Sequence, residues 1–287
     1  MKIYILHTEA DLQPNNQPFK YPLHNEDYGI EQDMFQYLKS NPSLLTSDPA
    51  TADFHYLPVF WTRWILNHNF GKHGLDELAQ KVNKIIIDDA KTFTVCQNDD
   101  GPMIDLGKCR VYLGSRKTNE GFDAPLLCSE HKLPFFKQKK KYLATFIGRL
   151  STHPIRLQMA EAVKDRSDVA FFDGDKGSRF FVKTMLRSHI ALCPRGYGGS
   201  SFRFYEAMQL GSVPFLIGDI DTRPFKKQIN WDAFTFFAHD AKEIPSILNK
   251  FTKEQLLEKG AYCKQFYEEH LVYQKWCNYL IQDLKLK

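Results

Sequence analysis

Two arginines and a run of small residues give the stretch 189–219 (HIALCPRGYGGSSFRFYEAMQLGSVPFLIGD) the groups that bind a charged ligand. Glycine lets backbone N–H groups approach a ligand closely, and the start of a helix favours negative charge. Arg195 and Arg203 add positive charge at the same place. The stretch therefore predicts a cradle for a diphosphate, although a purely structural turn uses the same residue types. The small residues of the loop are Gly196, Gly198, Gly199, Ser200 and Ser201.

Arg203 and Glu206 are three residues apart, so a helix places both side chains on one face. A carboxylate accepts two hydroxyl hydrogen bonds, which suits the diol of a ribose. We interpret Arg203 as a phosphate ligand and Glu206 as a ribose ligand. A surface ion pair between the two is the structural alternative.

Alternating strand and helix patterns position this stretch within two α/β domains with parallel sheets. Polar and basic residues at 131–141 (HKLPFFKQKKK) indicate a linker, which predicts domains at 1–136 and 137–287 with a cleft between them. In the first domain the expected strands are 2–6, 54–60 and 92–96, with two more short strands at 109–115 and 123–127, and the expected helices are 29–39 and 75–87. In the second, the expected strands are 142–148, 168–174, 189–194 and 213–219, and the expected helices are 153–165, 180–188, 200–210 and a tail from about 241.

The stretch 189–219 resembles the C-terminal signature of the exostosin family, glycosyltransferase family 47. YLATFIGR, which ends at Arg149, resembles the family's Phe-x-Gly strand. YGIEQDMFQYL and TSDPATADFHYLPVF resemble its N-terminal motifs, whereas HNFGKHG at 68–74 is at best a remnant of the block that many members carry there. The signature residues are Cys193, Pro194, Gly196, Ser201, Arg203, Glu206, Ala207, Gly211, Val213, Pro214 and Asp219, continued by Pro224, Phe225, Ile229 and Trp231.

The resemblance implies a GT-B fold of two Rossmann-like domains, with the acceptor in the N-terminal one and the nucleotide sugar in the C-terminal one. It also implies inverting transfer from a UDP-sugar, with UDP-xylose the first choice, to an oligosaccharide or glycoprotein. A non-catalytic glycan- or nucleotide-sugar-binding protein of the same fold is the alternative. The expected donor ligands are Arg149, Arg195, Gly198, Gly199, Ser200, Ser201, Arg203 and Glu206.

No metal cofactor is expected, because arginines and a helix start can neutralise the departing diphosphate. Two Asp-x-Asp strings, Asp173–Asp175 and Asp219–Asp221, are the alternative metal ligands.

Inversion also needs a general base for the acceptor hydroxyl. Asp27 is the first candidate, followed by Glu26 and Asp100, because they lie in loops that follow predicted strands. Weaker candidates are Glu31, Asp99, Asp123, His24 and His55.

Bulk properties exclude several other classes of protein. The net charge of +4 is mild, and the basic run 137–141 is interpreted as a solvated linker or as an attractor of an anionic glycan, not as a nucleic-acid site. Without an apolar run of membrane-spanning length or a signal peptide, we expect a soluble, cytoplasmic protein or a chain trimmed of its anchor. The six cysteines form no Cys-x-x-Cys pair, which disfavours zinc; free thiols are expected, with a Cys96–Cys109 disulfide as the alternative.

Overall fold

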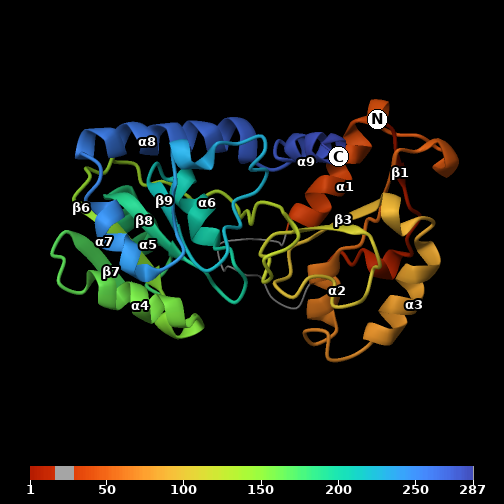
Figure 1. The fold of residues 1–287 in the computed structure, drawn as a ribbon, viewed down its shortest axis with the longest axis horizontal. Coiled ribbons are helices and arrows are strands. Elements are labelled where there is room, and N and C mark those ends of the chain that lie inside the picture. The colour runs from red at the N-terminus through yellow and green to blue at the C-terminus, as the bar shows by residue number, and fades with distance from the viewer. Residues whose placement is uncertain (17–28, 287) are drawn as a thin grey trace. The chain divides into compact units, whose positions relative to one another are not determined.

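The computed structural model describes residues 1–16 and 29–286, which form two compact units (Figure 1). Unit 1 consists of Met1–Leu127 and Tyr273–Lys287, and unit 2 consists of Cys128–Val272. Each unit is an α/β layer structure around its own parallel sheet. The predicted α/β class, with two domains that are each built on a parallel sheet, is confirmed.

Unit 1 has a five-stranded sheet in which the spatial order follows the chain order. Its strands are β1 (Ile3–Ile5), β2 (Phe54–Tyr56), β3 (Thr92–Cys96), β4 (Arg110–Leu113) and β5 (Phe122–Asp123). Its helices are α1 (Ile30–Ser40), α2 (Trp61–Asn67), α3 (Leu75–Ile85) and α9 (Cys277–Lys285). All five residues of β3 are buried, as expected for a central parallel strand that is covered on both faces.

The carboxyl group of Glu31 joins three elements of unit 1. It accepts hydrogen bonds from the backbone N–H of Thr62 at 3.1 Å, the Thr62 hydroxyl at 2.8 Å and the backbone N–H of Gln97 at 2.8 Å. The side chain therefore ties α1 to the start of α2 and to the end of β3. Burial raises the pKa of Glu31 to about 8, although these hydrogen bonds act in the opposite direction.

Glu31→Gln should remove a pH dependence of stability. The pKa of Glu31 is about 8 in the folded chain and 4.5 ordinarily, so between these values the folded state holds a proton that the unfolded state has released. The free energy of unfolding should therefore fall as pH rises, by at most about 1.4 kcal/mol per pH unit. Urea denaturation from pH 5 to 8.5 measures the free energy of unfolding of the parent and of Glu31→Gln. The difference between the two free energies should fall as pH rises. Exposed Glu161→Gln is the control, and a pH-independent difference for Glu31→Gln would contradict the assignment.

The end of the chain returns to unit 1, whereas the sequence placed it in the second domain. The carboxylate of Asp33 on α1 accepts hydrogen bonds from the backbone N–H of Gln274 at 2.7 Å and the indole N–H of Trp276 at 3.0 Å. On β4, the hydroxyl of Tyr112 donates to Asp283 of α9 at 2.8 Å. Side chains far apart in the sequence make these contacts, so periodicity alone could not show where α9 packs.

Unit 2 has a five-stranded parallel sheet with the spatial order β10-β9-β8-β6-β7. Its strands are β6 (Tyr142–Gly148), β7 (Val169–Asp173), β8 (Ser188–Pro194), β9 (Val213–Ile217) and β10 (Phe236–Ala238). Its helices are α4 (Pro154–Val163), α5 (Ser178–Leu186), α6 (Phe202–Gln209), α7 (Ile244–Leu248) and α8 (Lys253–Phe266). Helix α8 packs on α6, β8 and β9 (Figure 1).

The strand order of unit 2 reverses between β6 and β8. The chain passes from β6 outward to β7, then returns to place β8 on the other side of β6. In open α/β sheets, ligands bind outside the carboxyl ends of the strands at such a reversal. This topology puts a candidate site next to Gly148 and Pro194, the last residues of the two strands.

All six cysteines are free, including Cys96 and Cys109, so the default expectation is confirmed and the disulfide alternative is wrong. Over residues 1–16 and 29–286, no helix has the length and apolar character needed to cross a membrane.

Candidate anion-binding site in unit 2

The loops after β6 and β8 are joined by one buried guanidinium. Arg156 on α4 donates to the carbonyl of Arg149 at 2.8 Å and to the carbonyl of Arg195 at 3.0 Å. Arg149 follows β6 and Arg195 follows β8, so these two predicted ligands lie at the same edge of the sheet. Arg156 could not be found from the sequence, because nothing in its local pattern shows that its helix faces both loops.

Arg203 occupies the first turn of α6 and lies over the end of β6. Its guanidinium stacks on the ring of Phe146 at 4.8 Å and donates through Nη2 to the carbonyl of Ile147. Its Nε and Nη1 are buried and have no hydrogen-bond partner among the described residues. Buried donors are normally paired, so the two unpaired N–H groups of this half-buried guanidinium suit it to bind an anion.

Gly148 makes the position of Arg203 possible. Its φ of +156° is a conformation that side-chain-bearing residues rarely adopt, and a Cβ there would lie 2.5 Å from Nη2 of Arg203. Glycine at the end of β6 therefore lets the guanidinium lie against the strand. In the Phe-x-Gly pattern, the ring of Phe146 therefore stacks under Arg203, and Gly148 leaves room for its guanidinium.

Arg195 is the second cation of the site and is more deeply buried than Arg203, with 6% of its surface exposed. It forms an ion pair with Asp219 and donates from Nη2 to the carbonyl of Tyr197 at 3.3 Å. Its Nε is buried and without a partner among the described residues. The side chain of Asp219, in contrast, is 64% exposed.

The loop between the two arginines is ordered by its own backbone. The N–H of Gly196 donates to the carbonyl of Ser200 at 3.2 Å, and the hydroxyl of Thr222 donates to the carbonyl of Gly199 at 3.2 Å. None of the loop glycines has a left-handed φ, so their contribution is the absence of a side chain. Ser201 precedes α6 and makes no side-chain capping bond, so it does not cap the first-turn N–H groups of that helix.

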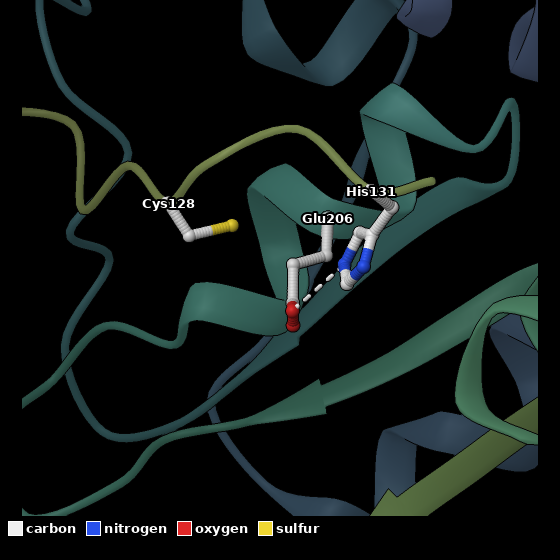
Figure 2. Close-up of side chains that lie close together, drawn as sticks. All are labelled: Cys128, His131 and Glu206. Atoms are coloured by element: carbon white, nitrogen blue, oxygen red, sulfur yellow. Dashed lines mark hydrogen bonds and ion pairs between the residues drawn. The ribbon is translucent and has the colours of Figure 1, made fainter. Parts of the chain in front are cut away.

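Glu206 lies one turn beyond Arg203 and is 5% exposed. Its Oε1 is 3.0 Å from Nε2 of His131, and Figure 2 shows the ring and the carboxylate facing each other. The backbone N–H of His131 also donates to Gln209 at 3.3 Å. His131 was missed by the sequence analysis because it lies 75 residues from Glu206, at the start of the presumed linker.

Cys128 lies beside this pair, and the ligand atoms of Cys128, His131 and Glu206 are all within 4.8 Å of one another (Figure 2). Thiolate, imidazole and carboxylate are the groups that bind Zn²⁺. Burial, with a smaller contribution from the nearby Glu206, raises the pKa of Cys128 well above its ordinary value. The trio could hold a soft divalent ion, but the direct contact between Glu206 and His131 already uses two of its three ligand groups.

The two Asp-x-Asp strings have local partners. The carboxylate of Asp173 accepts from the N–H of Leu150 at 2.9 Å, and that of Asp175 accepts from the N–H of Gly177 at 2.7 Å. Asp219 pairs with Arg195 as described above. Asp221 forms ion pairs with Arg223 at 2.9 Å and Lys226 at 3.1 Å, and these cations hold its pKa below the usual value despite burial.

The predicted bases are only partly covered by the structure. Glu26 and Asp27, with His24, lie outside the described residues. Asp100 is in unit 1, is 58% exposed, and pairs with Lys117. Asp123 makes two hydrogen bonds to the guanidinium of Arg116, at 2.9 and 3.0 Å. The identity of the base therefore stays a prediction.

Comparisons with known proteins identify the domain that contains this site. Residues 122–254 match the Exostosin GT47 domain. The chain is 30% identical over 168 residues to an exostosin-1 homolog of Caenorhabditis elegans, covering 50% of this chain and 44% of that protein. It is 32% identical over 81 residues to a probable beta-1,4-xylosyltransferase IRX10 of Arabidopsis thaliana, and 31% identical over 83 residues to a probable glucuronosyltransferase GUT1 of Oryza sativa subsp. japonica.

Each plant match covers 28% of this chain and 20% of the plant protein, so the chain spans less than half the length of all three relatives. The matched region contains the ends of β6 and β8, Arg195 and Arg203, and the pair formed by His131 and Glu206. Residues 122–254, which contain the candidate anion site, are therefore similar to the exostosin GT47 domain.

Proposed function

We propose that the chain is an inverting glycosyltransferase that moves a sugar from a UDP-sugar to a hydroxyl of an oligosaccharide or glycoprotein. The observation that carries the proposal is the half-buried guanidinium of Arg203, whose Nε and Nη1 have no partner among the described residues, at the strand reversal of a domain similar to the GT47 domain. UDP-xylose is our first choice of donor. A UDP-glucuronic acid donor is the second, because the relatives include proteins named as xylosyl- and as glucuronosyltransferases.

In this reaction the base takes the proton of the acceptor hydroxyl, and the hydroxyl oxygen attacks the anomeric carbon from the face opposite the diphosphate. The bond between that carbon and the diphosphate oxygen breaks, and UDP leaves with the electron pair. Arg203, Arg195 and the start of α6 would neutralise the charge that develops on the leaving oxygen. Glu206, held by His131, would accept hydrogen bonds from the ribose hydroxyls.

A thermal-shift screen of nucleotide sugars tests the proposal, because a ligand that binds only the folded state raises its stability. UDP and one UDP-sugar should raise the melting temperature, and the same UDP-sugar should then be consumed with an acceptor glycan. UDP-sugar binding without hydrolysis or transfer would favour the alternative, a binding protein of the same fold.

Gly148→Ala should weaken UDP binding by at least about tenfold while the chain stays folded. The new Cβ would lie 2.5 Å from Nη2 of Arg203, so the flexible guanidinium must move and lose its charge-assisted bonds to phosphate. Gly177→Ala is the matched control, since its φ is +76° and a Cβ there meets nothing within 4 Å. Calorimetry on both variants measures the effect. Equal UDP affinity in the two would show that Arg203 does not contact the diphosphate.

Transfer should survive EDTA, because two arginines and a helix start are available in place of a cation. The measurement is turnover after exhaustive chelation, compared with turnover in added Mn²⁺ or Mg²⁺. Complete loss with rescue by either ion would instead assign metal binding to an Asp-x-Asp string or to the Cys128 cluster.

A further inference from the structure

The segment 132–139, here called the apolar–basic loop, exposes three large apolar side chains in succession. Leu133 is 56% exposed, Phe135 96% and Phe136 75%. The two phenyl rings form an edge-to-face pair with centroids 5.2 Å apart. Single exposed apolar residues are ordinary on a protein surface, but a contiguous group indicates a surface that contacts something else.

The base of the apolar–basic loop is fixed on both sides. On one side, His131 is held by Glu206 at 3.0 Å and by Gln209 at 3.3 Å. On the other, the ammonium of Lys140 donates to the carbonyl of Ser188 at 2.6 Å and to that of Gly211 at 3.0 Å. Lys140 is therefore part of the framework, which corrects the interpretation of 137–141 as a uniformly solvated linker. The apolar tip projects from a fixed base instead of packing into the core.

Exposed cations flank the apolar side chains: Lys132, Lys137 and Lys139. No acidic residue occurs between positions 131 and 142. Phenylalanine and leucine bury themselves at the boundary between lipid headgroups and acyl chains, and nearby lysines are attracted to anionic headgroups. The loop thus combines the apolar and the electrostatic parts of interfacial membrane binding.

We propose that the apolar–basic loop inserts into the surface of an anionic phospholipid membrane and holds unit 2 there. An acceptor glycan is the competing occupant, since sugars also stack on aromatic rings. The membrane is favoured for two reasons. The two ring planes meet at 88°, so the rings do not form one flat surface on which a sugar could stack. Leucine and three lysines also lie beside the rings, and these residue types suit a lipid surface. This inference does not rest on the proposed transfer activity.

Flotation with vesicles of phosphatidylcholine and phosphatidylserine, compared with phosphatidylcholine alone, tests the proposal on the full chain. The parent should bind the anionic vesicles, and binding should weaken as salt rises. The double variant Phe135→Ser/Phe136→Ser should bind at least about tenfold less, through loss of apolar burial. The triple variant with Lys132, Lys137 and Lys139 changed to Gln should bind about 100-fold less at low salt.

Matched controls separate the loop from general surface effects. Leu157→Ser removes another exposed leucine of unit 2, and a triple change of exposed Lys176, Lys183 and Lys227 to Gln removes the same charge. Both controls should bind vesicles nearly as well as the parent.

Insertion itself is visible by fluorescence, because the four native tryptophans are buried and Phe135→Trp adds one at the tip. Its emission should shift to the blue when anionic vesicles are added. No shift and no flotation would overturn the proposal. If, in addition, Phe135→Ser/Phe136→Ser raised the KM for an acceptor glycan, the loop would be a glycan-binding element instead.

Discussion

Arg203→Met should lower turnover by about 10²–10³, because removing one preorganised donor from a developing oxyanion costs about that factor in other enzymes. In the parent the guanidinium lies 4.8 Å from the centre of the Phe146 ring. Methionine fills most of the same volume, so the packing over this ring should be kept in the variant. The variant loses the hydrogen bond to the carbonyl of Ile147 and also Nε and Nη1, the two donors that have no partner among the described residues. Affinity for UDP should fall with turnover, since the ground-state diphosphate is also charged.

Arg203→Lys should recover only part of this loss, because an ammonium keeps the charge but cannot reproduce the planar fork. Arg179→Met, which removes an exposed guanidinium on α5, is the control for a general effect of lost charge. Steady-state kinetics with the accepted UDP-sugar measures all three. Turnover of Arg203→Met within threefold of the parent would remove this residue from the reaction.

Neutralising the true general base should lower turnover by about 10²–10⁴ and leave UDP affinity unchanged. The candidates are Asp27 first, then Glu26 and Asp100, tested as Asp27→Asn, Glu26→Gln and Asp100→Asn. Each substitution removes the negative charge with little change of volume. A base acts on the acceptor, not on the nucleotide, so the split between turnover and UDP binding distinguishes it from a donor ligand.

Asp100 also pairs with Lys117, so a small effect of Asp100→Asn on stability is expected. Lys117→Met would break the same pair and serves as its control. If the three carboxylate variants all keep near-parent turnover, the base lies elsewhere in the chain.

Periodicity predicted most of the framework around the site. The strands 142–148 and 189–194 and the helix at 200–210 correspond to β6, β8 and α6 within a few residues. These elements are long or strongly patterned, and glycine marks the end of the helix at Gly211, which has a φ of +67°.

Short elements were harder to predict. FHYLPVF was expected to be one strand, but pairing ends at Tyr56, and Trp61 begins a helix that is buried on nearly every side. This helix has only seven residues, and its Thr62 and Arg63 are buried together with its apolar residues, so its pattern shows no clear amphipathic period. The strand β10 was missed because it has only three residues, next to a segment with a helical pattern.

The sequence indicates the residue types of the candidate site but not the contacts among them. Local sequence indicates that Arg195, Arg203 and Glu206 follow a strand and share a loop and helix. It does not indicate that Gly148 makes room for Arg203, or that His131 contacts Glu206, because those partners come from other parts of the chain. Tertiary packing determines which N–H groups of the two arginines remain without a partner, and the proposed function depends on those groups.

Calorimetric titration of UDP into the parent chain tests the central claim most directly. Binding should be saturable, with one site per chain and a dissociation constant below the millimolar range. Gly148→Ala should lower the affinity and Gly177→Ala should not. Absence of UDP binding at millimolar concentration, by a chain shown to be folded, would contradict the assignment of the anion site to the diphosphate of a UDP-sugar.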